Sequence, residues 1–177
     1  MADIYGVMAE FEEADQLLEA GQKAYAEGYR EMDAYSPFHI EGLADAVGFH
    51  RSRVSLVFLV AGIIGGVGAF FMQWAIAKLD YPINVGGRPL NSWPAWIPIT
   101  FELTVLFSGV IGFIGLLIMN NLPMPYHPVF NVPSFSASAS RDRFFLCIEA
   151  RDPKFDLEQT RAFLSGLNPL EVSEVEK

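Results

Sequence analysis

Residues 54–77 read VSLVFLVAGIIGGVGAFFMQWAIA, and residues 97–119 read IPITFELTVLFSGVIGFIGLLIM. The first run carries no formal charge and the second carries one, on Glu102. Each run is long enough to cross the hydrocarbon core of a bilayer, which takes about 20 residues of helix. Because backbone polar groups in lipid must be satisfied within the segment, we predict two membrane-spanning helices joined by residues 78–96. The alternative is a pair of buried helices in a soluble protein, although soluble helices this long usually show a polar face.

The composition around these two runs limits the possible functions. The chain has 177 residues and a formal net charge of -9, and residues 1–53 contain eleven acidic side chains against four of Lys and Arg. This balance argues against nucleic-acid binding, which needs a basic face. A single cysteine, Cys147, excludes an internal disulfide and any Cys-x-x-Cys metal or redox site. With no recognised catalytic, cofactor or metal motif, the residues indicate a non-catalytic membrane subunit in contact with the lipid bilayer.

The segment before the hairpin is patterned as strand, helix, strand. Residues 4–9 and 31–35 favour strands because they are rich in apolar, aromatic or β-branched side chains. The acidic stretch from Glu10 suits the start of a helix, and Gly28 is expected to end it. A further short helix is predicted over residues 40–49.

The segment after the hairpin begins with prolines and then serines. Residues 120–140 are predicted to be an extended linker on this composition. Residues 143–150 (RFFLCIEA) form the clearest strand pattern in the chain. Asp156, followed three residues later by Gln159, resembles a capping box that opens a helix. Residues 170–175 favour a last short strand.

Taken together, the elements predict an α+β membrane protein. Strand-helix-strand on both sides of a hairpin is the order of a split ferredoxin-like (βαββαβ) domain. The hairpin, residues 54–119, would be inserted between two halves of a cytoplasmic domain, residues 1–53 and 141–177. Right-handed crossovers would then place both helices on one face of the sheet. The alternative is two unrelated tails that never meet.

The orientation of the hairpin follows from its flanking charges. Arg51 and Arg53 precede the first span, whereas Lys78 and Arg88 lie in the loop between the spans. The positive-inside rule, counted over these positions and two later arginines, favours both termini in the cytoplasm. The unpaired Cys147 fits a reducing compartment.

Two polar residues within the spans are the candidate site. Glu102 lies about one and a half turns inside the second span, roughly 8 to 10 Å deep at 1.5 Å per residue. Gln73 lies at a similar depth in the antiparallel first helix. We predict a hydrogen bond between Glu102 and Gln73 across the hairpin. Two roles stay open for Glu102: packing near the interface, or a proton path, which intramembrane ionisable groups often mark.

Small residues near this polar pair predict close helix packing. On the first helix they continue toward Gln73, and on the second helix Gly109 shares a face with Glu102. Ser108 and two later glycines form another small-residue face, which we interpret as a docking face for helices of other subunits, the alternative being loose packing against lipid. The predicted packing residues are Gly62, Gly66, Ala69, Gly109, Gly112 and Gly115.

Four stretches together carry a resemblance to a known family. They are WPAWIPITFELTVLF (residues 93–107), IYGVMAEFEEADQLLEAGQKAYAEGYREMDAYSPF (residues 4–38), HPVF (residues 127–130) and DRFFLCIEA (residues 142–150). With the glycine-rich first span, the chain resembles the ActD family, the small two-helix subunits of bacterial alternative complex III. The similarity extends over nearly the whole chain except the acidic tail.

The resemblance implies an integral subunit of a quinol:electron acceptor oxidoreductase in the bacterial inner membrane. Haem c and iron-sulfur clusters are then expected in partner subunits and not in this chain. The implied partners are the polytopic quinol-binding subunits, the iron-sulfur protein, the cytochrome c subunits and a terminal oxidase. This subunit would brace the quinol-binding subunits. The alternative function is a membrane-tethered regulatory protein or an accessory subunit of a transporter.

Overall fold

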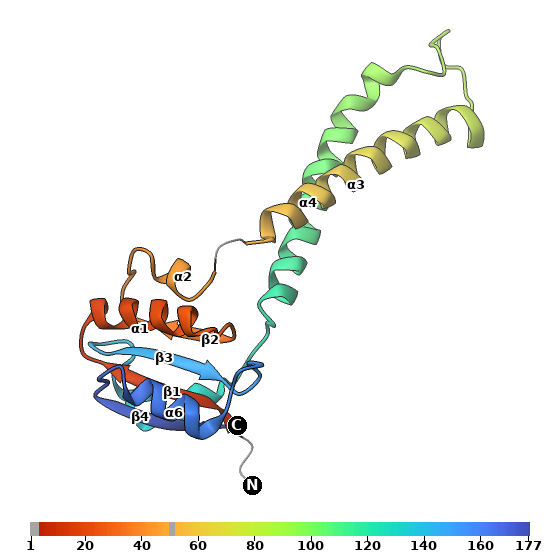
Figure 1. The fold of residues 1–177 in the computed structure, drawn as a ribbon. Helices are drawn as coiled ribbons and strands as arrows, with labels where there is room; N and C mark the ends of the chain where they lie inside the picture. The colour runs from red at the N-terminus through yellow and green to blue at the C-terminus, as the bar shows by residue number, and fades with distance from the viewer. Residues whose placement is uncertain (1–3, 50–51) are drawn as a thin grey trace. The chain divides into compact units, whose positions relative to one another are not determined.

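The computed structural model describes residues 4–49 and 52–177, and it divides the chain into two compact units (Figure 1). One unit combines the described residues before position 50 with Pro125–Lys177. The other is Ser52–Met124, which contains the two apolar helices. Arg51, one of the positive charges in the orientation argument, lies outside the described residues.

The first unit contains a four-stranded antiparallel sheet. Its strands are β1 (Ile4–Phe11), β2 (Met32–Tyr35), β3 (Phe144–Glu149) and β4 (Glu171–Glu176), in the spatial order β2-β3-β1-β4. All three neighbouring pairs are antiparallel. Each strand that precedes the hairpin therefore pairs with strands that follow it. The two flanking segments form one sheet, and the alternative of two unrelated tails is wrong.

The first helix begins and ends as its sequence indicates. α1 (Ala14–Glu27) opens with a reciprocal capping box, in which the Glu13 side chain and the Gln16 side chain each accept from the other residue's backbone N–H. It ends at Gly28, whose φ of 113° is a left-handed conformation that glycine adopts without a Cβ clash. Local residue chemistry therefore sets both ends of α1.

The second sheet-packing helix, α6 (Leu157–Ser165), follows the same logic. The Asp156 side chain accepts the Gln159 backbone N–H at 3.0 Å, as the capping pattern predicts. Both helices contribute to a single apolar core on one face of the sheet, with Leu17 of α1 and Leu164 of α6 fully buried. The predicted placement of both helices on one face is confirmed.

The opposite face of the sheet is covered by the segment that was expected to be an extended linker. This segment forms the 3₁₀ turn η3 (Pro128–Asn131) and the short helix α5 (Pro133–Ser138). The linker prediction is wrong because it considered only the prolines and serines. Three apolar side chains, spaced by three residues, lie among them and pack against the sheet. These side chains pack with Met8, Phe145, Cys147 and Val175 of the sheet; they are Val129, Val132 and Phe135. All six residues of β3 are consequently buried.

The helix expected over residues 40–49 is shorter than predicted. α2 spans Leu43–Ala46 and lies against α1. The contact is made at Gly21 of α1, where a Cβ would lie at an ordinary contact distance of 3.5 Å from the Ala46 side chain. A single apolar turn is enough to close this edge of the core.

The second unit is a hairpin of two long apolar helices. α3 (Val54–Ala75) continues into a π-helical turn, η1 (Ile76–Asp80), and α4 (Ile97–Met119) is preceded by a 3₁₀ turn, η2 (Trp93–Trp96). With these turns, both helices are long and apolar enough to cross a membrane. Only 22% and 6% of their most hydrophobic windows are buried within the chain. They are therefore not the buried core of a soluble domain in this chain.

Candidate functional site

Gln73 is the polar centre of the hairpin interface. Its Nε2 lies within hydrogen-bonding distance of Thr100 Oγ1 at 3.2 Å, the Trp96 carbonyl at 3.3 Å and the Ala69 carbonyl at 3.2 Å. Two of these three acceptors belong to the opposite side of the hairpin. Amide hydrogen bonds of this kind join helices in an apolar environment. Gln73 thus holds the loop end of α3 against the start of α4.

Glu102 does not form the predicted hydrogen bond with Gln73. Its side chain is exposed and has no hydrogen bond or ion pair with any described residue. Thr100, which takes the place predicted for Glu102, lies two residues earlier. At about 100° per residue, this spacing puts Thr100 about 160° around the helix from Glu102. The similar depth of Gln73 and Glu102 therefore does not make them neighbours.

The small residues of α3 that bring the helices together include a row next to the predicted one as well as members of the predicted row. The buried residues of α3 are Ala61, Gly65 and Ala69, spaced by four, and Gln73 continues this row. A Cβ on Gly65 would lie 2.7 Å from the Leu103 carbonyl oxygen. This is backbone contact that only glycine permits. Of the predicted row, Ala69 is buried and Gly66 also approaches α4 closely, because a Cβ there would lie 2.7 Å from Thr104 Oγ1. A Cβ on Gly62 would lie at an ordinary contact distance of 3.7 Å from the Ser108 side chain.

The packing and docking roles predicted for the glycines of α4 are partly exchanged in the structure. Gly112 and Gly115 pack inside the hairpin, because a Cβ would lie 2.5 Å from the Phe58 ring and 2.7 Å from Val57 Cγ1, respectively. The Ser108 hydroxyl also donates to the Phe58 carbonyl at 3.1 Å. The face expected to meet other subunits is therefore used by α3. Gly109, expected to pack, has no atom within 4 Å of a Cβ position.

An open cavity lies where the hairpin helices meet their loop. It has a volume of about 370 Å³ and its lining includes Gln73, Trp96 and the loop residues Arg88 and Ser92. The Trp96 ring is buried and packs edge-on against Phe70 at 5.5 Å between centroids. Gln73 is thus reachable from the loop side while it holds the helices together.

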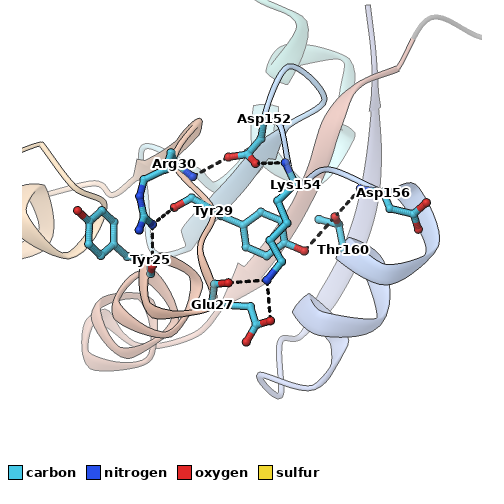
Figure 2. Close-up of polar contacts among 8 residues, drawn as sticks. All are labelled: Tyr25, Glu27, Tyr29, Arg30, Asp152, Lys154, Asp156 and Thr160. Atoms are coloured by element: carbon cyan, nitrogen blue, oxygen red, sulfur yellow. Dashed lines mark hydrogen bonds and ion pairs between the residues drawn. The ribbon is translucent and has the colours of Figure 1, made fainter.

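In the sheet unit, the Asp152 carboxylate connects two backbone segments that are far apart in the chain (Figure 2). Its Oδ2 accepts the backbone N–H groups of Arg30 at 2.6 Å and Glu31 at 2.8 Å, and its Oδ1 accepts that of Lys154 at 2.7 Å. Burial alone would raise the pKa of Asp152, but these three donors together lower it below the ordinary value. The ionised carboxylate therefore ties the start of β2 to the turn after β3.

Lys154 and Tyr29 extend this connection toward the helices (Figure 2). Lys154 Nζ pairs with the Glu27 carboxylate at 2.7 Å and also donates to the Glu27 carbonyl oxygen. The Tyr29 hydroxyl lies 3.1 Å from Thr160 Oγ1, and both side chains are buried. We call Glu27, Tyr29, Asp152, Lys154 and Thr160 the Asp152 clamp. It joins residues that are more than 120 positions apart in the chain.

A second group of ionisable side chains lies on β3 and its neighbours. Burial raises the pKa of Glu149; the nearby Arg151 opposes this shift, whereas Asp33 adds to it. Arg151 contacts the Glu149 carboxylate and also pairs with Glu31 at 3.1 Å. Burial and the charge of Glu149 likewise raise the pKa of Tyr5. Arg151 is the cation that offsets the negative charge of Glu149 and Glu31 in this group.

Cys147 is predicted to resist thiol reagents in the folded chain. It is fully buried in β3, and burial together with the carboxylates of Glu149 and Asp33 raises its pKa well above the ordinary value. We expect no measurable maleimide labelling of the full chain in mild detergent at pH 8, and complete labelling after denaturation, both read by mass spectrometry. Native labelling at the rate of a free thiol would contradict the buried position.

The positions of the His, Cys, Asp and Glu side chains show whether the described residues could hold a metal ion. Among residues 4–49 and 52–177, no group of three or more His, Cys, Asp and Glu side chains is placed to hold a metal ion. His127 has other contacts, since its ring lies against Tyr5 and its Nδ1 accepts the Val129 N–H.

These features define a class of chain in which a small α+β sheet domain is interrupted by a hairpin of apolar helices that could span a membrane. The family described as "Alternative complex III, ActD subunit" matches residues 5–174, which is nearly the whole chain. The chain belongs to this family and is therefore a subunit of alternative complex III, a quinol-oxidising respiratory complex whose other subunits are its partners. No curated protein matches the chain.

Proposed function

We propose that this chain is a non-catalytic integral subunit that braces the quinol-binding membrane subunits of alternative complex III. The observation that carries the proposal is the hairpin. Its two helices are long enough to span a bilayer, are largely exposed along their lengths, and use their polar groups to hold each other. Exposed apolar helices of this kind require lipid or other membrane subunits as neighbours. The family match favours this function over an accessory subunit of a transporter.

The location and fold of the soluble part belong to the same proposal. The strand order β2-β3-β1-β4, with antiparallel neighbours and both α1 and α6 on one face, supports a split ferredoxin-like domain. Arg53 beside the first span and the unpaired Cys147 support a cytoplasmic position for this domain at the inner membrane. Haem c, iron-sulfur clusters and the quinol sites would then belong to the partner subunits.

Co-purification tests the proposal directly. A tagged copy of the full chain, extracted in mild detergent, is expected to bring with it haem absorbance, iron and quinol oxidation activity at a fixed ratio to the tag. The same chain isolated alone is expected to contain neither haem nor iron. Isolation of the single chain with bound haem, or its recovery in water without detergent, would contradict the proposal.

A contribution of Glu102 to a proton path is the second candidate function. It is favoured by one observation: Glu102 is an acid that the hairpin itself leaves unpaired and exposed. If the path exists, Glu102→Gln is expected to lower proton translocation by the complex at least about tenfold, since general acid-base groups typically contribute 10²–10⁴-fold. The measurement is pH change in proteoliposomes, with subunit content as control. Unchanged proton translocation at full assembly would exclude this function.

A further inference from the structure

The outer side of α4 carries Glu102, the one charged residue of α3 and α4. Thr100 accepts from Gln73 of α3, whereas Glu102, about 160° further around the helix, meets nothing in the hairpin. The cations between α3 and α4 do not compensate it, because neither Lys78 of η1 nor Arg88 of the loop forms an ion pair with Glu102 in the described hairpin. Lys78 lies over the Trp74 ring instead, 5.9 Å from its centroid.

A continuous surface surrounds Glu102 on this side. Seven residues later, Gly109 falls on the same face, and unlike Gly112 it has no neighbour within 4 Å of a Cβ position. Val105, Leu106 and Phe113 flank it, with side chains 55%, 53% and 59% exposed. We call Glu102, Val105, Leu106, Gly109 and Phe113 the Glu102 face. It combines a carboxyl group with a glycine that has open space around it within the hairpin.

A carboxyl group in this position needs a partner. In a hydrocarbon environment an ionisable side chain is costly, and such groups almost always pair with another polar group or face a water-filled cavity. The Glu side chain is also too short to reach water as readily as Lys or Arg does by extending along the helix. Apolar helices do not attract each other in lipid by hydrophobicity, so association depends on close packing and on hydrogen bonds. The Glu102 face offers both.

We propose that the Glu102 face docks against a transmembrane helix of another subunit of the complex, and that this helix donates a hydrogen bond to Glu102 from a basic or hydroxyl side chain. The proposal rests on the proposed membrane function of the chain and names the surface through which it is held. The choice of occupant follows from the complementarity that a carboxyl group requires and from membership of a multisubunit complex. The partner's small or medium side chain lies over Gly109.

Photo-crosslinking in the assembled complex tests the contact. A photoreactive amino acid at Val105 or Phe113 is expected to form an adduct with a transmembrane helix of another subunit. Mass spectrometry is expected to map the adduct within one helical turn of a Lys, Arg, His, Ser, Thr or Tyr. Adducts with lipid alone at both positions would overturn the proposal. A probe at Ile63, which is exposed on α3, is the control for non-specific capture.

Substitutions of Glu102 and Gly109 test the chemistry of the contact, and a glycine elsewhere in the hairpin serves as the control. Glu102→Leu and Gly109→Leu are each expected to lower retention of the subunit in the purified complex about fivefold or more, with Glu102→Gln less affected. Gly68→Leu is the control, because Gly68 is also without neighbours within 4 Å. Retention that is unchanged or raised by Glu102→Leu, or lowered equally by Gly68→Leu, would overturn the proposal. If the unaltered chain does not co-purify with the haem-containing complex at all, the proposed function itself fails.

Discussion

Gly65→Leu is expected to separate the two helices of the hairpin. A Cβ at this position would lie 2.7 Å from the Leu103 carbonyl oxygen and 2.7 Å from Phe107 Cβ. The first of these atoms is backbone and cannot turn away, so α3 and α4 must move apart. Overpacking that shifts the backbone typically costs about 1–3 kcal/mol, and we expect a value near the top of this range. The substitution should also weaken the Gln73–Thr100 hydrogen bond that depends on the same approach.

The measurement is thermal unfolding of the full chain in mild detergent, followed by tryptophan fluorescence. Trp96 is a suitable reporter because it is buried against Phe70 at the loop end of the hairpin. Gly68→Leu is the matched control, since an added side chain there meets open space within the hairpin. Equal melting temperatures for Gly65→Leu and Gly68→Leu would show that the helices do not approach each other at Gly65.

Asp152→Ala is expected to destabilise the sheet domain by about 3–5 kcal/mol at pH 7. The carboxylate accepts three backbone N–H groups, and a hydrogen bond to a charged group has a net contribution of about 1.5–3 kcal/mol, which is not additive among bonds to one group. Its removal also releases the tie between β2 and the turn that carries Lys154. Asp156→Ala, which removes only the cap of α6, should cost about 1 kcal/mol and is the control. Denaturant-dependent labelling of Cys147 in the full chain measures both.

The contribution of Asp152 should depend on pH with a definite sign. Its pKa is lowered in the folded chain, so its stabilisation is fully present above the unfolded value of about 4 and is lost as the pH falls through the folded pKa. Asp152→Asn removes this titration while keeping the shape of the side chain. The difference in stability between the unaltered chain and Asp152→Asn should therefore shrink below pH 4. A difference that grows on acidification would contradict the ionised clamp.

Much of the fold was predictable because its signals are local. The four strands, the capping residues of α1 and α6, and the two apolar helices all follow from patterns within about twenty residues. The segment 128–138 was not predictable in the same way. Its prolines and serines indicate a linker, and the three apolar residues that pack on the sheet show their role only when the uncovered face of β3 is known.

The candidate site was predicted less well for a geometric reason. Successive residues on a helix point about 100° apart, so an assignment that is wrong by one or two positions selects another face. Gly65, which was not predicted, makes the backbone contact beside Gly66, and Thr100 rather than Glu102 bonds to Gln73. The row Ala61, Gly65, Ala69 and Gln73, with its regular spacing of four, was the available signal.

The amino-acid sequence alone determined the hairpin, the strands on either side of it and the family to which the chain is similar, because hydrophobic runs and turn residues act over short distances. The tertiary structure decided which faces meet: Asp152 with the start of β2, the former linker with the sheet, and Gln73 with Thr100. These contacts depend on helix rotation and on pairing across more than 100 residues of chain. Neither the rotation of a helix nor long-range pairing can be read from a short stretch of sequence. Only the tertiary structure therefore places Glu102 on the outside of the hairpin.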